Sequence, residues 1–185
     1  MSDRKRKKSK KLIDLLVQNY HSNHRKKAEQ EIGKIAQDHI SRGLANTTSV
    51  VRKKLSVEYD YIEELLDHLF NSLEHDHPDL SPQIYNNIIN NVIESEYKKL
   101  FSIVKGWLNE ANMHQENMIK EYKNNISEKL DKSKKRIDSR CELLNEKRNS
   151  KKYSFDTKWV IGIIIAIIPI IITIIIEVID LSQRS

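Results

Sequence analysis

Residues 159–179 form an uninterrupted apolar segment in a chain that otherwise carries many charges. Isoleucine occupies most of its positions, and its only charged side chain is Glu177, close to its end. At about 1.5 Å per residue, a helix of this length extends over about 31 Å, which matches the hydrocarbon thickness of a bilayer. The sequence therefore predicts a single C-terminal transmembrane helix.

Pro169 lies near the middle of this segment and removes one backbone hydrogen-bond donor. Each isoleucine favours insertion by roughly 0.3 to 0.6 kcal/mol, whereas an interior proline costs roughly 3 kcal/mol, so the isoleucines outweigh the proline. We expect the segment to insert with a kink at Pro169. Small or polar residues also share one face of the expected helix, where a second helix can pack closely: Gly162, Ala166, Pro169 and Thr173.

Basic residues flank the segment unequally. Six of them lie over residues 140–158, whereas only Arg184 follows the segment. Because basic residues near a span remain on the cytoplasmic side, we expect a cytoplasmic N-terminus and a short far-side tail over residues 180–185. The apolar run at residues 12–17 is too short for a signal peptide and contains Asp14. The chain is therefore predicted to be a single-pass, tail-anchored membrane protein.

Residues 1–11 account for the net charge of +6, since they hold seven basic residues and one acid. A segment of this composition buries little apolar surface, so we expect a disordered polybasic arm over residues 1–11. Its cations suit contact with anionic lipid or with nucleic acid, and a solvated tail without a ligand is the alternative. The basic residues concerned are Arg4, Lys5, Arg6, Lys7, Lys8, Lys10 and Lys11.

Residues that break helices are scarce. The chain has four glycines and three prolines, and residues 83–161 contain no proline and a single glycine. Apolar residues recur at spacings of three and four over residues 12–43, over residues 48–74 and from residue 82 onward, which is typical of amphipathic helices. We expect an all-α fold with a cytoplasmic helical bundle over residues 12–110. The first of these ranges holds either one helix or two, and Gly43 suits the position after its end.

A narrower apolar pattern follows residue 110. Its positions repeat at three, four and four residues, and this eleven-residue repeat predicts a straight or slightly right-handed helix. We expect one unbroken helix from residue 82 to about 150, in which residues 111–148 form a stalk or coiled coil. Such a narrow seam needs a partner, either another protein or a second copy, and membrane tethering favours the second copy. The expected oligomer seam consists of Ile119, Tyr122, Ile126, Leu130, Ile137 and Leu144.

A basic, polar stretch over residues 149–158 separates this repeat from the apolar segment. It contains three lysines and no residue of the eleven-residue repeat. We expect it to form a juxtamembrane hinge between the stalk and the span.

Few residues in the chain suggest a chemical reaction. Imidazole and carboxylate groups form two weak candidate metal clusters: Glu74, His75, Asp76, His77 and Asp79, and the pair His21 and His24. Histidines in a polar loop are more often solvated than bound to a metal. Cys141 falls in the stalk seam and is expected to be a packed, reduced thiol. The sequence lacks a phosphate-binding glycine loop, a serine elbow and paired cysteines. We therefore expect no enzyme activity, no metal site and no cofactor.

An anchor, a bundle and a stalk together predict a non-enzymatic, membrane-tethered helical scaffold or adaptor that self-associates and binds a cytoplasmic protein. One alternative is an oligomerising, membrane-perturbing effector of the lysis or host-defence type, assembled through the small-residue face of the span. A second alternative is a tether that holds nucleic acid at the membrane through the basic arm, without sequence specificity.

Overall fold

The computed structural model describes the backbone over residues 3–44, 47–75, 81–113 and 116–183, and it describes side chains from residue 7 to residue 150 within those ranges. The described backbone is helical apart from its turns and contains no strand, which confirms the all-α prediction. Its four helices are α1 (Asp3–Ser41), α2 (Thr48–His75), α3 (Pro82–Glu110) and α4 (Glu116–Gln183). The chain divides into two compact units, Met1–Cys141 and Glu142–Ser185.

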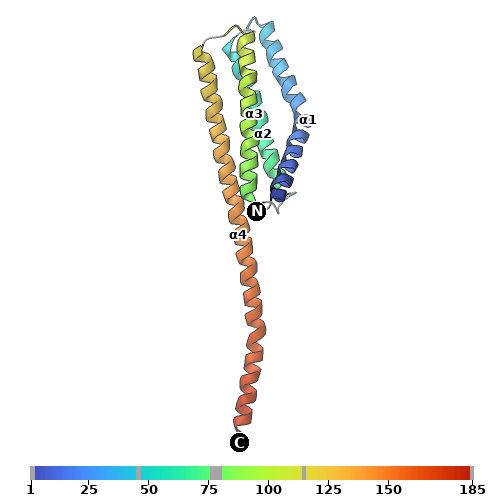
Figure 1. The fold of residues 1–185 in the computed structure, drawn as a ribbon, viewed down its shortest axis with the longest axis vertical. Helices are drawn as coiled ribbons and strands as arrows, with labels where there is room; N and C mark the ends of the chain where they lie inside the picture. Colours follow the sequence, from blue (N-terminus) through green and yellow to red (C-terminus); the bar gives the residue numbers. More distant parts are fainter. Residues whose placement is uncertain (1–2, 45–46, 76–80, 114–115, 184–185) are drawn as a thin grey trace. The chain divides into compact units, whose positions relative to one another are not determined.

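In the first unit, α2 and α3 lie at the centre and α1 packs against both of them (Figure 1). Consecutive helices run antiparallel. The Tyr20 hydroxyl of α1 donates to the backbone carbonyl of Tyr61 in α2, and the Tyr85 hydroxyl of α3 donates to the carbonyl of Leu73, near the end of α2. The short connections between these helices favour this up-and-down arrangement.

The first part of α4 lies on the other side of the central pair (Figure 1). The Tyr59 hydroxyl of α2 donates to Asn125 Oδ1 at 2.9 Å, and the Tyr97 hydroxyl of α3 lies 3.1 Å from Ser133 Oγ. These bonds join α4 to both central helices. The bundle therefore contains four helical segments rather than three.

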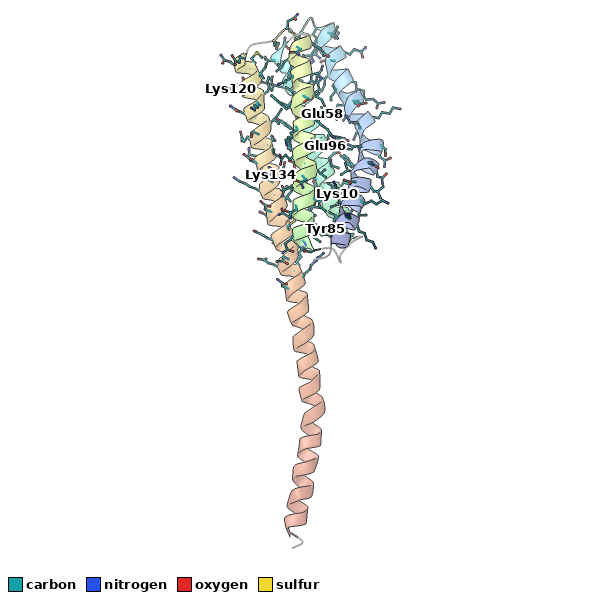
Figure 2. All side chains as sticks on the ribbon, in the orientation of Figure 1. Lys10, Glu58, Tyr85, Glu96, Lys120 and Lys134 are labelled. Atoms are coloured by element: carbon teal, nitrogen blue, oxygen red, sulfur yellow. The ribbon has the colours of Figure 1, made fainter. Side chains whose placement is uncertain are left out.

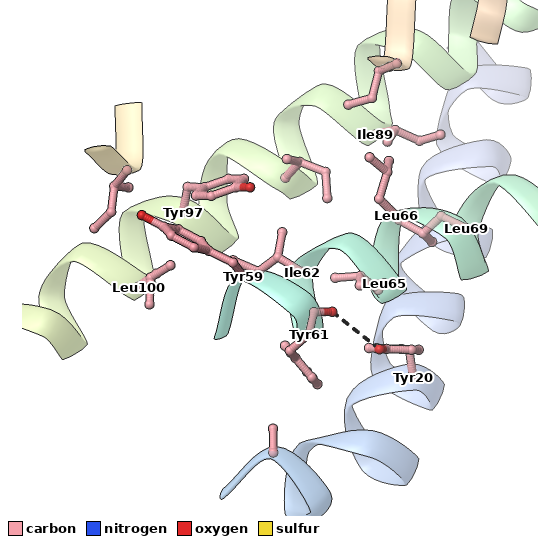
Figure 3. Close-up of a cluster of buried hydrophobic side chains, with 14 of the residues drawn as sticks. Tyr20, Tyr59, Tyr61, Ile62, Leu65, Leu66, Leu69, Ile89, Tyr97 and Leu100 are labelled. Carbon is pink, nitrogen blue, oxygen red and sulfur yellow. Dashed lines mark hydrogen bonds between the residues drawn. The ribbon is translucent and has the colours of Figure 1, made fainter. Parts of the chain in front are cut away.

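Apolar side chains of α2 form the middle of the core, because this helix is packed on several sides (Figure 3). Leu65, Leu66 and Leu69 are fully buried and belong to one continuous cluster with Ile89 of α3 and Tyr20 of α1. Complete burial of one such leucine contributes roughly 1.5 to 3 kcal/mol. The apolar pattern predicted over residues 48–74 is confirmed, since the residues that recur at spacings of three and four are all buried: Val51, Leu55, Tyr59, Ile62, Leu66, Leu69 and Leu73.

Helix α1 ends at a glycine with positive φ. Gly43 has φ +71°, its N–H donates to the carbonyl of Ile40, and the N–H of Leu44 donates to the carbonyl of His39. This pair of bonds is the Schellman arrangement, in which glycine is favoured because it has no Cβ. The position expected for Gly43 is confirmed, and of the two alternatives for residues 12–43 the structure has the single helix.

Replacing Gly43 by alanine should lower the free energy of unfolding by about 1 kcal/mol, because an L-residue in the left-handed region is strained by roughly that amount. An added Cβ would meet no atom within 4 Å, so the backbone alone sets this cost. Gly33→Ala is the matched control: Gly33 lies inside α1 without a positive φ, and there alanine should stabilise. Equal effects of the two changes in urea unfolding would contradict the prediction.

The single helix predicted from residue 82 to about 150 is wrong. It is divided into α3 and α4 by a turn at Asn112, which has φ 55°. The N–H of Asn112 donates to the carbonyl of Asn109, and the N–H of Met113 donates to that of Leu108. Asparagine tolerates the left-handed region, so this helix ends in the Schellman arrangement without the glycine that usually signals it.

The disordered arm predicted over residues 1–11 is also not observed, because α1 already begins at Asp3. Ser9 and Ile13 are buried one turn apart and continue the packed face of α1 toward its start. Lysine and arginine favour helices about as well as leucine does, so the basic composition does not oppose helix formation once one face is packed.

The predicted boundary between bundle and stalk after residue 110 is not where the first compact unit ends, because this unit extends to Cys141. Helix α4 continues through residues 149–158, where a hinge was predicted, and its backbone is helical up to Gln183. The predicted span over residues 159–179 and the tail after it lie outside the part whose side chains are described. Within residues 7–150, the part whose side chains are described, no helix is long and apolar enough to cross a membrane.

Candidate functional site

A cavity of about 310 Å³, lined by charged and apolar side chains, opens between α1, α2 and α3. Figure 2 shows two of its acids, Glu58 of α2 and Glu96 of α3, near the middle of the bundle. Its lining combines charged and aromatic groups with an apolar floor: His21, Arg25, Glu58, Tyr61, Ile62, Glu96, Lys99, Leu100 and Ile103. A smaller cavity beside His24 and a groove beside Lys7 each involve only two helices.

Arg25 and Glu58 form the central ion pair of this cavity. Nη1 and Nη2 of Arg25 donate to the two carboxylate oxygens of Glu58 at 2.7 and 2.8 Å. Glu58 is only 2% exposed, whereas Arg25 also reaches Glu29 near the surface. The hydrogen bond to Glu58 raises the pKa of Arg25, so the guanidinium stays charged. Two parallel bonds fix both the distance and the angle between α1 and α2.

A second group of polar contacts links all three helices. His21 Nδ1 is hydrogen-bonded to the Tyr61 hydroxyl, and His21 Nε2 lies 3.6 Å from Glu96 Oε1. Burial raises the pKa of Tyr61 to about 12, so this hydroxyl keeps its proton at neutral pH. Lys99 donates to the same Glu96 oxygen at 2.7 Å. With the imidazole proton on Nε2, His21 accepts from Tyr61 and faces the carboxylate with its N–H.

Every charged group around the cavity thus has a partner within the chain. Two cations, Arg25 and Lys99, face two acids, Glu58 and Glu96. The lining contains no thiol, and the raised pKa of its one hydroxyl, that of Tyr61, makes this group a poor nucleophile. Chemically, the arrangement can hold helices in register and bind a small polar molecule by hydrogen bonds.

Sequence reasoning missed this cavity as a unit. The sequence suggests His21 and His24 as a metal pair, but the structure gives them different contacts, since His24 stacks on Tyr20 with ring centroids 4.4 Å apart. Glu58 is the residue that could have indicated a buried ion pair, because this carboxylate falls among the apolar positions of α2. Its cation, Arg25, lies on the preceding helix. A buried acid requires a cation, and the sequence alone did not show which one.

The other candidate metal cluster is described only in part. Glu74 and His75 end α2, and Glu74 accepts a hydrogen bond from Arg140 Nε at 2.7 Å instead of lying free. Asp76, His77 and Asp79 lie outside the described residues. Over the described part of the chain, no group of three or more histidine, cysteine or acidic residues is placed to hold a metal ion.

The predicted oligomer seam is largely buried against the chain's own helices. Tyr122, Ile126 and Ile137 belong to the hydrophobic core, and Ile119 and Leu130 are partly buried against it. The eleven-residue pattern therefore marks a packed face, as predicted, but the partner of these residues is α2 and α3 of the same chain. Leu144, the last member of the predicted seam, is half-buried and belongs to the second unit.

Ion pairs border this contact between α4 and α2. Arg136 Nη1 donates to Glu63 at 2.6 Å, and Arg136 Nη2 donates to Asp67. On the side of α3, Lys134 lies 3.3 Å from Glu94. Exposed pairs of this kind contribute little each, so the narrow apolar seam carries most of the attachment of α4.

Cys141 lies at the end of the buried seam and is 6% exposed. Burial, followed by the charges of Asp138 and Glu74, raises its pKa to about 11. We expect it to react with iodoacetamide at pH 8 at least a hundredfold more slowly in the folded chain than in urea, because only the thiolate reacts and its fraction is small. Equal rates with and without urea, measured by mass spectrometry, would show that α4 is not packed as described.

The polybasic residues divide into two groups. Lys7, Lys8, Lys10 and Lys11 are exposed on the first turns of α1, whereas the side chains of Arg4, Lys5 and Arg6 lie outside the described residues. Lys7 and Lys10 line a groove against α3. The predicted packing face of the span, formed by Gly162, Ala166, Pro169 and Thr173, is likewise outside the part with described side chains.

No family model, curated protein or solved structure matches the chain.

Proposed function

We propose that the chain is a non-enzymatic helical scaffold or adaptor that residues 159–179 tether to a membrane. The observation that carries this proposal is the composition of that segment, in which isoleucine predominates and the only charge is Glu177. The continuous helical backbone of α4 supports it, because a helix satisfies its own hydrogen bonds in lipid. The positive flank before the segment supports a cytoplasmic bundle.

The bundle is the part that we propose to bind a cytoplasmic protein. Its hydrophobic core is continuous through four helical segments, and the charged groups of its cavity pair with one another. Both features make the bundle rigid, and a rigid surface suits the binding of a partner protein. Because the seam of α4 is used within the chain, we propose self-association through the small-residue face that contains Gly162 and Ala166.

Carbonate extraction tests the membrane tether. The full chain should remain in the membrane pellet at alkaline pH, and Ile168→Lys with Ile171→Lys should release it. Each lysine at the centre of a span costs roughly 2.5 to 3.5 kcal/mol, so two of them cancel the apolar gain that remains after the proline penalty. Asn87→Lys with Asn124→Lys adds the same charge at exposed positions of α3 and α4 and should not release the chain. Release of the unchanged chain would overturn the proposal.

A second candidate function, the membrane-perturbing effector, is favoured by the small-residue face of the same segment. Induced expression should then collapse the membrane potential, and Gly162→Ile should relieve this by blocking close helix approach. A membrane potential that stays stable at full expression would rule out the effector and would leave the scaffold as the proposed function.

The nucleic-acid tether has less support than either of these functions, because it rests only on the basic residues at the start of α1.

A further inference from the structure

A groove of about 660 Å³ lies between the first turns of α1 and the first half of α3. Two lysines and one acid come from α1, and two apolar and two neutral polar residues come from α3. The lining residues are Lys7, Lys10, Asp14, Ile88, Asn91, Val92 and Ser95. Its volume falls within the range of about 300 to 1,000 Å³ that is typical of sites for small organic ligands.

The two sides of the groove differ in chemistry. Ile88 and Val92 are one turn apart on α3, are half-buried and pack against the core, so they form an apolar floor. Lys7 and Lys10 are exposed on α1, and neither forms an ion pair with any described residue. Asp14 is the only acid in the lining, so the rim carries a net positive charge.

We propose that this groove binds one anionic glycerophospholipid, with its phosphate between Lys7 and Lys10 and the first carbons of one acyl chain on Ile88 and Val92. A lysine ammonium is a common phosphate ligand. Removal of acyl carbons from water along the apolar floor adds roughly 0.8 kcal/mol for each buried methylene. Asn91 and Ser95 supply neutral hydrogen-bonding groups beside the proposed headgroup position.

Charge and shape distinguish this occupant from others. A single-stranded nucleic acid uses aromatic side chains on which its bases stack, and the lining contains none. An inorganic anion would leave Ile88 and Val92 uncovered. An amphiphile with a negative head and an apolar chain matches both sides of the groove.

The groove lies near the end of the bundle at which the first unit ends, which would place it close to membrane lipid. Lys10 and Tyr85 lie toward the same end of the bundle in Figure 2. At that end Asn86 donates to Asp138, shortly before the first unit ends at Cys141. The last residues of the first unit therefore lie toward the end of the bundle that carries the lysines. In this respect the inference rests on the proposed function, because a membrane-tethered chain meets phospholipid at high local concentration.

Photo-crosslinking of the full chain in phosphatidylcholine nanodiscs tests the proposal. The probe is phosphatidylserine with a diazirine in one acyl chain, present at 5 mol %. We expect it to label the α3 peptide that contains Val92. Lys7→Glu with Lys10→Glu should reduce this labelling at least tenfold, and Val92→Ser should reduce it severalfold. A phosphatidylcholine probe with the same diazirine should label this peptide weakly.

The matched control is Lys26→Glu with Lys34→Glu. It makes the same charge change at exposed positions of α1 outside the groove, and it should leave labelling of α3 unchanged. Circular dichroism would confirm that both charge variants keep the helical content of the unchanged chain. Equal losses in the two charge variants would overturn the proposal, since the lysines would then act only through overall charge.

Two further outcomes would also overturn the proposal. In one, the phosphatidylcholine probe labels the Val92 peptide as strongly as phosphatidylserine does. In the other, inorganic phosphate or an acidic peptide displaces the probe at equal concentration, which would indicate a simple anion site or a protein surface. If the chain does not enter nanodiscs, the proposed tether fails, and dispersed dioctanoyl probe then tests the groove on the chain in solution with the same variants.

Discussion

Replacement of Ile137 by asparagine should detach the first part of α4 from α2 and α3. Ile137 is 0% exposed and lies near the end of the buried seam. Asparagine removes most of the apolar contact and leaves a cavity, and its amide finds no partner among the surrounding apolar groups. Together these effects cost about 3 to 5 kcal/mol. A neutral amide is preferable to aspartate as a probe, because Arg140 lies one turn away and could pair with a carboxylate.

The reactivity of Cys141 reports the detachment directly. A difference of about 1.4 kcal/mol changes an equilibrium tenfold, so alkylation of Cys141 should become at least a hundredfold faster in Ile137→Asn. Leu143→Asn is the matched control on the same helix, because Leu143 is 56% exposed and should tolerate the change. An Ile137→Asn variant that dissociates on dilution, with unchanged Cys141 reactivity, would instead support a seam between two copies.

The contrast between α2 and α4 shows what hydrophobic periodicity can predict. The wide stripe of α2 is predictable from sequence because only burial on several sides explains it. The narrow pattern at Tyr122, Ile126 and Ile137 is equally visible, but periodicity identifies a packed face and not the surface that covers it. The turn at Asn112 decides this, since it returns the chain so that α4 meets α2 and α3, and asparagine is a weak signal for such a turn.

The cavity that contains Arg25 and Glu58 was less predictable than the core. Hydrophobic positions are visible from their spacing, whereas the pairing of Arg25 with Glu58 depends on the relative axial position of α1 and α2. One helical turn of displacement, about 5.4 Å, would separate these groups. The basic groove is similar: Lys7 and Lys10 are identifiable as cations, but the apolar floor that accompanies them comes from α3, much later in the chain.

Replacement of Arg25 by methionine should lower the free energy of unfolding at pH 7 by about 3 kcal/mol, because it leaves the Glu58 carboxylate buried without its cation. Glu58 is 2% exposed, and both of its oxygens accept from Arg25. Methionine keeps much of the length of the side chain, so lost packing contributes little. Urea unfolding of the full chain in a nonionic detergent, followed by circular dichroism, would measure the change.

Two variants separate the buried pair from the exposed one. Glu29 is the other acid that pairs with Arg25, and its side chain is 61% exposed. Glu29→Gln should therefore lower the free energy of unfolding by no more than about 0.5 kcal/mol. The double change Arg25→Met with Glu58→Met should recover most of the lost stability, because an apolar pair of similar volume needs no counterion. A double variant as unstable as Arg25→Met would show that shape rather than charge determines this contact.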